Sequence, residues 1–196
     1  MATNVNRRTD EFGGGVEGRS RFLLALVDAL APLWGADRIG VRLHPGQRLA
    51  DVHDNDPVLT CRHLVPELSR RGVGYLHLSL RPVGWNLLGM ARRLFDGTIV
   101  AGGGLSSTSA AQHLSEGVMD LASFGRAFLA NPDLVRRYQQ GWSITRPDPA
   151  TYYTQGREGY IDYPLFADTD VPTQIPPTCR PRPPMTWPED TRPLRP

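Results

Sequence analysis

The sequence predicts an α/β protein with a parallel sheet, because short apolar strands alternate with helical patterns along the chain. Connections of this kind are right-handed crossovers that place successive strands side by side. The predicted strands that begin at residues 98 and 121 each start 23 residues after the strand before them, the first of these intervals being counted from residue 75. Such regular units fit either a (β/α) barrel or an open doubly wound sheet, and no GxGxxG motif follows the first strand to favour the second.

Helices are predicted from apolar periodicity and from their ends. In residues 20–34 apolar side chains recur every three or four positions, and Gly35 follows as a typical helix C-terminus. The second helix covers 56–71, with Asp56 as its cap and Pro57 in its first turn. Further helices are expected at 86–94, at 106–116 with Ser106 or Ser107 as cap, and at 132–140.

Four short β-rich runs are the predicted strands. They cover residues 39–43, 75–80, 98–101 and 121–125. Four βα units are half the number in an eight-stranded barrel, whose usual length is about 250 residues.

The composition limits the chemistry. All 22 basic side chains in the 196 residues are arginine, so a Schiff-base lysine and a phosphate loop ending in Gly-Lys-Ser/Thr are excluded. A net charge of +2 does not indicate a nucleic-acid or membrane surface. Cys61 and Cys179 are far apart and no zinc-binding spacing occurs, and the most apolar run, 22–34, is neither a signal peptide nor a membrane span. We therefore expect a reduced, cytoplasmic protein with no metal site.

Half of the 18 prolines fall between Pro172 and Pro196. This composition cannot hold a helix and offers little to bury. We predict a domain over 1–170 and an extended or disordered tail over 171–196, for which a proline-motif ligand is the functional alternative.

Glycines at two strand ends predict a phosphate site. Residues 101–104 read Ala-Gly-Gly-Gly between a strand and a helix, where glycine allows close backbone approach and the helix start favours an anion. The next strand ends in Phe124-Gly125-Arg126, and an arginine can hold phosphate with two hydrogen bonds. Either piece alone would be a weak signal.

Several other polar residues have open interpretations. Arg42 lies in an apolar strand, either in a structural ion pair or as a cation facing an electron-rich ligand. His77 alternates with leucines, so a core histidine and a site residue are equally open. Three residues after the first strand could suggest a metal but favour a polar loop, and three tyrosines are expected to pack. These two sets are His53, Asp54 and Asp56, and Tyr138, Tyr152 and Tyr153.

An ordered series of motifs over about residues 4–166 resembles the C-terminal half of the Old Yellow Enzyme family of FMN-dependent NAD(P)H oxidoreductases. The motifs are NRRTDEFGG (6–14), EGRSRF (17–22), GVRLHP (40–45), YLHL (75–78), AGG (101–103), FGR (124–126), NPDL (131–134) and GYIDYP (159–164). Departures are Gly18, His44 and Ile161, where the family usually has Asn, Ser and Thr.

The resemblance implies the fold of a (β/α)8 TIM barrel, of which about the last four βα units are present. It implies FMN at the mouth, with Arg42 facing the N1 and C2 carbonyl edge of the flavin. It also implies that the FMN phosphate is held by Gly103, Gly104, Gly125 and Arg126. Tyr160 resembles a tyrosine that lies near the flavin in the family. The implied reaction passes hydride from NAD(P)H through FMN to an activated alkene, such as an α,β-unsaturated carbonyl.

In the family, the residues that bind the substrate oxygen and supply the proton come from the first half of the barrel. We expect this chain to lack them and to expose two sheet edges, so that it forms a homodimer or pairs with a complementing N-terminal half barrel. Two hypotheses stay open: an oxidoreductase polypeptide that is complete once the other half is supplied, and a truncated, non-catalytic half barrel with at most weak flavin binding.

Overall fold

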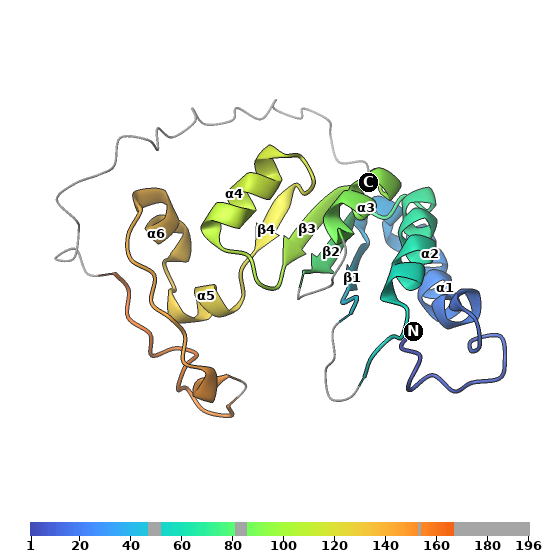
Figure 1. The fold of residues 1–196 in the computed structure, drawn as a ribbon, viewed down its shortest axis with the longest axis horizontal. Helices are drawn as coiled ribbons and strands as arrows, with labels where there is room; N and C mark the ends of the chain where they lie inside the picture. The colour runs from blue at the N-terminus through green and yellow to red at the C-terminus, as the bar shows by residue number, and fades with distance from the viewer. Residues whose placement is uncertain (47–51, 81–85, 153, 167–196) are drawn as a thin grey trace.

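The computed structural model of the chain describes residues 1–46, 52–80, 86–152 and 154–166, so the predicted tail at 171–196 lies outside the described residues. Helices and strands alternate as predicted (Figure 1). The elements are α1 (Val16–Trp34), η1 (Ala36–Arg38), β1 (Gly40–Leu43), α2 (Pro57–Arg70), β2 (Tyr75–Ser79), α3 (Leu87–Leu94), β3 (Thr98–Gly102), α4 (Ser107–Ser115), β4 (Leu121–Ser123), α5 (Arg126–Ala130), α6 (Leu134–Gln140) and η2 (Pro149–Thr151).

The four strands form one parallel sheet in the order β1-β2-β3-β4, which confirms the predicted parallel α/β architecture. Each strand pairs with the next along the chain, as expected for right-handed βα units. The register places Arg42 beside His77 and His77 beside Val100. All four strands therefore end at the same edge, where parallel α/β proteins build their sites.

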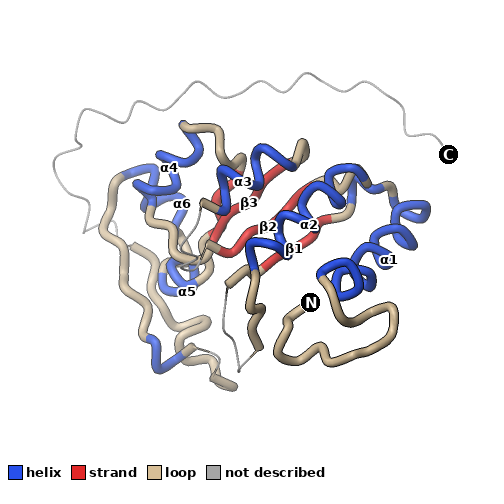
Figure 2. The backbone as a smooth tube through the Cα atoms, turned by 45° about the vertical axis from the view of Figure 1, so that its right-hand side comes forward, coloured by secondary structure: helices blue, strands red, loops and turns tan. Residues whose placement is uncertain are grey.

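The two faces of the sheet differ in burial. Side chains that alternate along the strands, including Leu76, Leu78 and Ile99, are fully buried under the helices. Figures 1 and 2 show α1, α2 and α3 together on this side of the sheet. The opposite, inner face is more open, with Tyr75 44% and Leu121 55% exposed. The inner face is therefore the surface from which polar side chains can reach a ligand.

Side-chain caps fix the starts of three helices. The Asp56 carboxylate accepts a hydrogen bond from the Leu59 amide at 2.9 Å, and Asn86 and Ser106 cap α3 and α4 in the same way. Gly35, at φ 86°, ends α1 as predicted. These caps confirm Asp56 and decide between the two serines in favour of Ser106.

Three boundaries differ from the prediction by two residues or more. Helix α1 begins at Val16 rather than at residue 20, because the buried face continues one turn further back. Strand β4 ends at Ser123, two residues early, and the short helix α5 follows at once. Helix α6 begins at Leu134, after Pro132 has interrupted the helical path.

Candidate functional site

Arg42 lies on the inner face at the open edge of the sheet. Its strand buries Val41 and Leu43 on the helical side and leaves Arg42 exposed on the other. No salt bridge involves Arg42 within the described part of the chain. The structural ion pair considered from the sequence is therefore absent among the described residues, and the Arg42 side chain is exposed on the inner face.

His77 stands beside Arg42 on the same face. Its Nε2 lies 3.0 Å from the Ser123 hydroxyl, a contact that passes over β3 at a position without a side chain. That position is Gly102, where an added Cβ would come within 2.2 Å of the Ser123 oxygen. Burial lowers the pKa of His77 below its ordinary value, and the charges of Arg42 and His44 lower it further. His77 is thus a hydrogen-bonded histidine on the inner face, with a pKa below its ordinary value.

The predicted phosphate-binding glycines leave the same edge together. Gly102 and Ser123 are register partners, so the residues that follow each of them emerge from neighbouring strand ends. Gly103 (φ 85°) and Gly104 (φ 123°) adopt conformations that side chains disfavour. A Cβ built on Gly104 or on Gly125 would meet no atom within 4 Å. The backbone at both places is consequently open to close approach by a ligand.

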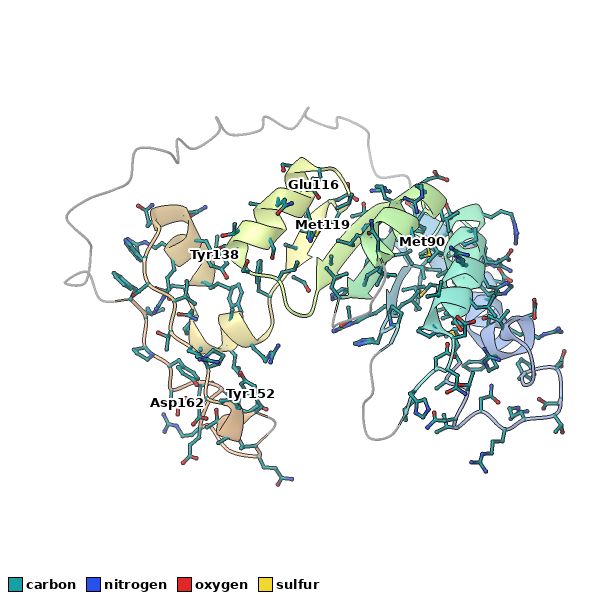
Figure 3. The ribbon with its side chains drawn as sticks, viewed as in Figure 1. Met90, Glu116, Met119, Tyr138, Tyr152 and Asp162 are labelled. Atoms are coloured by element: carbon teal, nitrogen blue, oxygen red, sulfur yellow. The ribbon has the colours of Figure 1, made fainter. Side chains whose placement is uncertain are left out.

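Arg126 follows Gly125 and is exposed at the first position of α5. Its guanidinium carbon lies 6.0 Å from the centre of the Tyr152 ring, which belongs to the C-terminal part of the chain (Figure 3). Tyr160, from the same part, is 40% exposed. The register of β3 and β4 thus places four predicted residues at the C-terminal ends of these two neighbouring strands: Gly103, Gly104, Gly125 and Arg126.

The two predicted groups are separated across the sheet. Arg42 is on β1 and Arg126 follows β4, three strand spacings away. At about 4.8 Å for each spacing, the lateral separation is on the order of 14 Å. A single ligand must be elongated to touch both arginines, with an electron-rich group at one end and an anion at the other. FMN, with a flavin ring at one end and a phosphate at the other, fits this arrangement of donors.

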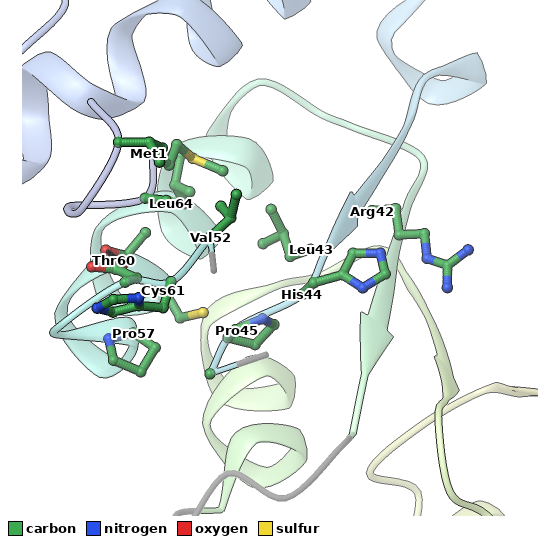
Figure 4. A pocket seen from close by; sticks show the side chains of 15 residues that line it. Met1, Arg42, Leu43, His44, Pro45, Val52, Pro57, Thr60, Cys61 and Leu64 are labelled. Carbon is green, nitrogen blue, oxygen red and sulfur yellow. Dashed lines mark hydrogen bonds between the residues drawn. The ribbon is translucent and has the colours of Figure 1, made fainter. Parts of the chain in front are cut away.

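A cavity of about 610 Å³ lies beside the end of β1. Its lining is mostly apolar and includes Leu43, Val52, Cys61 and Leu64 (Figure 4). In the close-up, the Arg42 side chain extends away from these residues. Arg42 and His44 also line the cavity, so it reaches from the layer between β1 and α2 to the C-terminal end of β1.

Other residues considered from the sequence have structural roles. The Asp54 carboxylate accepts hydrogen bonds from the Thr60 hydroxyl and the Asp56 amide, and no group of three potential metal ligands occurs in the described ranges. Tyr138 packs edge-to-face against Phe124 at 5.4 Å, as expected, whereas Tyr153 lies outside the described residues. Burial, with a smaller effect of the Asp54 charge, raises the pKa of Cys61 to about 12. None of the helices described is long and apolar enough to cross a membrane.

Sequence reasoning did not assign a role to Arg137, which is only 3% exposed. Its partners lie in segments whose positions depend on the tertiary fold. The one available signal was the NPDL motif at 131–134, which the sequence offered as a landmark without a function.

Comparison with known proteins identifies relatives of this chain. The family model of the NADH:flavin oxidoreductase / NADH oxidase family matches residues 1–144. A 12-oxophytodienoate reductase 1 from Oryza sativa subsp. japonica is 37% identical over 181 residues, which cover 87% of this chain and 47% of that protein. A probable flavin mononucleotide-dependent alkene reductase from Leishmania infantum is 36% identical, with coverages of 85% and 46%.

Solved structures of related proteins resemble this chain over the same share of its length. Morphinone reductase in complex with tetrahydroNAD superposes with a TM-score of 0.76 at 38% identity, over 86% of this chain and 47% of that one. An Old Yellow Enzyme homologue from Zymomonas mobilis gives 0.76 at 30% identity, with coverages of 85% and 49%. The chain thus spans about half the length of the relatives it matches.

Proposed function

The chain belongs to the NADH:flavin oxidoreductase / NADH oxidase family, and we propose that its four βα units are the C-terminal half of an FMN-binding (β/α)8 barrel. The activity proposed for the completed barrel is that of an Old Yellow Enzyme. The chemistry that bound FMN supplies is hydride transfer from NAD(P)H to an activated alkene, such as an α,β-unsaturated carbonyl. The substrate is accordingly a small molecule.

The observation that carries this proposal is the shared register of β3 and β4. It brings Gly103 and Gly104 together with Gly125 and Arg126 at the C-terminal ends of the strands. In this position, open backbone and an exposed guanidinium can hold a phosphate group. Tyr160 is assigned, by the resemblance of its motif, to the surroundings of the flavin ring.

Arg42 serves the other end of the same ligand. It lies on the inner face, exposed and without an ion pair to a described residue. From there it would place a fixed positive charge against the pyrimidine edge of the ring. A cation held in advance at that edge stabilises negative charge that hydride transfer brings there. The pKa of His77, next to Arg42, is lowered, which disfavours a second positive charge beside the guanidinium.

A second candidate function is a half barrel that binds flavin weakly and catalyses nothing. The open inner face favours it, since Tyr75 and Leu121 remain 44% and 55% exposed. In the oxidoreductase hypothesis, a second copy of the chain or a complementing half barrel covers this face. The expected behaviour of the chain alone is the same in both readings: FMN is not retained through gel filtration.

Parallel titrations with FMN and riboflavin test the proposal, because the two ligands differ only in the phosphate. We expect FMN to bind more tightly, by about fivefold or more for one partly exposed arginine–phosphate contact. Equal affinities would remove the phosphate site, and binding of neither ligand would show that the chain alone does not form the proposed flavin site. Flavin absorbance that co-elutes with the purified chain would contradict the expected weak retention.

A further inference from the structure

Three buried or half-buried residues at and after the NPDL motif hold both ends of one long loop. We define the clasp as Asn131, Asp133 and Arg137, and the C-terminal loop as residues 142–152 and 154–166. We propose that the clasp positions the C-terminal loop against Arg126. This inference rests on the proposed function, since Arg126 is the residue assigned there to the FMN phosphate.

Arg137 connects the two ends of the loop. Its Nη1 donates to the Ser143 carbonyl and to the Thr145 hydroxyl, both at 3.2 Å, at the start of the loop. Its Nη2 donates to the Pro164 carbonyl at 3.1 Å, at the end of the loop. Its Nε donates to the Asp133 carboxylate at 2.7 Å. All three guanidinium nitrogens therefore bond to the protein, and the side chain is almost fully buried.

The other two members of the clasp each hold one end of the loop. The Asn131 side chain accepts from the Thr145 amide at 2.8 Å and donates to the Thr145 carbonyl at 2.9 Å. The second carboxylate oxygen of Asp133 accepts from the Phe166 amide at 2.9 Å. Trp142 stacks on Phe166 with ring centres 4.4 Å apart, which joins the two ends directly. Start and end are thus tied to one point on the α5–α6 segment.

Between its fixed ends the loop has internal hydrogen bonds of its own. The Asp148 amide donates to the Tyr163 hydroxyl at 2.9 Å, and the Gly159 amide donates to the Asp162 carboxylate at 2.8 Å. The far part of the loop carries Tyr152, whose ring lies 6.0 Å from the Arg126 guanidinium carbon. Figure 3 shows Tyr152 and Asp162 together at this end. Because the loop is braced internally, fixing its two ends also sets the place of Tyr152.

The buried charges of the clasp argue against a role limited to general stability. Burial of a guanidinium and a carboxylate costs desolvation free energy that a hydrophobic pair would not. The return is geometric, because a planar guanidinium reaches acceptors from both ends of the loop at once. We therefore describe Arg137 and Asp133 as positioning residues that act on the phosphate end of the site through Tyr152.

The test compares Asp133→Asn and Arg137→Met with Arg62→Met, a control at an exposed arginine on α2. Two measurements are made on the whole chain without flavin. The first is amide hydrogen exchange at Thr145 and Phe166. The second is the rate at which phenylglyoxal modifies Arg126, resolved by mass spectrometry. A purely structural clasp would alter only the first.

We expect exchange at Thr145 and Phe166 to rise about tenfold or more in Arg137→Met, as for loss of a charged hydrogen bond. Modification of Arg126 should accelerate about twofold or more as Tyr152 moves away. Asp133→Asn, which keeps the shape of the side chain, should change both in the same direction by less. The control should change neither.

Unchanged exchange in both variants would overturn the clasp, and faster exchange with unchanged Arg126 modification would overturn its positioning role. If Arg137→Met unfolds, Asp133→Asn decides, and unfolding of both would make the cluster a folding determinant instead. Failure of FMN to bind would contradict the proposed function. It would not affect the amide-exchange and Arg126-modification measurements, because both are made without flavin.

Discussion

Arg42 and Arg137 show two opposite uses of the same side chain. Arg42 is exposed on the inner face of β1, and no salt bridge engages it within the described ranges. Arg137 is buried on α6 and contacts Asp133 and both ends of the C-terminal loop. The first forms no ion pair with a described residue, whereas the second uses all three of its guanidinium nitrogens in bonds to the protein. In this chain without lysine, burial and partners separate the arginines proposed to bind a ligand from the structural ones.

The largest expected effect follows from removing the buried member. Arg137→Met leaves the Asp133 carboxylate and two loop carbonyls without their partner, so we expect the free energy of unfolding to fall by about 3 kcal/mol. Urea unfolding followed by circular dichroism measures this, with Arg62→Met as control. A loss below about 0.5 kcal/mol, the range of ordinary surface changes, would erase the contrast between the two arginines.

A pair of glycine variants separates backbone strain from open space. Gly104→Ala places a side chain at φ 123°, which should cost about 1–3 kcal/mol of folding free energy. Gly125→Ala should cost little, because φ is −90° there and the added Cβ meets nothing within 4 Å. Thermal unfolding compares them. Equal losses at both positions would contradict the described backbone.

For the exposed arginine we expect almost no effect on folding. Arg42→Ala should change the free energy of unfolding by less than about 0.5 kcal/mol, as an exposed side chain without an ion pair should. The same urea experiment checks it. A loss near that of Arg137→Met would show that Arg42 is a structural residue.

The smallest effect concerns pH. The folded chain holds the pKa of His77 below its ordinary 6.5, through burial first and then through Arg42 and His44. The unfolded chain therefore takes up this proton first as pH falls, so His77 contributes stability above about pH 6.5 that is lost below it. Arg42→Ala should raise the pKa, which an NMR titration of the imidazole measures. An unchanged pKa of His77 in Arg42→Ala would show that the charge of Arg42 does not act on His77.

Periodicity, caps and strand spacing predict the order and type of most elements, because these signals are local. Asp56 illustrates this, since its cap on α2 needs only residues three positions apart. Helix α5 could not be predicted, because five residues are too few to show a helical period.

Long-range contacts were beyond the sequence. The contact between His77 and Ser123 joins residues 46 positions apart and depends on the register of three strands. The role of Arg137 depends on Pro164, which the fold brings back from 27 residues away. Arg42 was identified from a local pattern, but that it is exposed and lies on the inner face required the sheet.

The central claim is that Arg42 and Arg126 hold the two ends of one flavin ligand. Calorimetric or fluorescence titrations of FMN and riboflavin against Arg42→Ala and Arg126→Met test it directly. Arg42→Ala should weaken both ligands equally, because both carry the ring, and Arg126→Met should weaken FMN by about fivefold and leave riboflavin unchanged. Equal weakening of both ligands by Arg126→Met, or unchanged affinity in Arg42→Ala, would contradict the account.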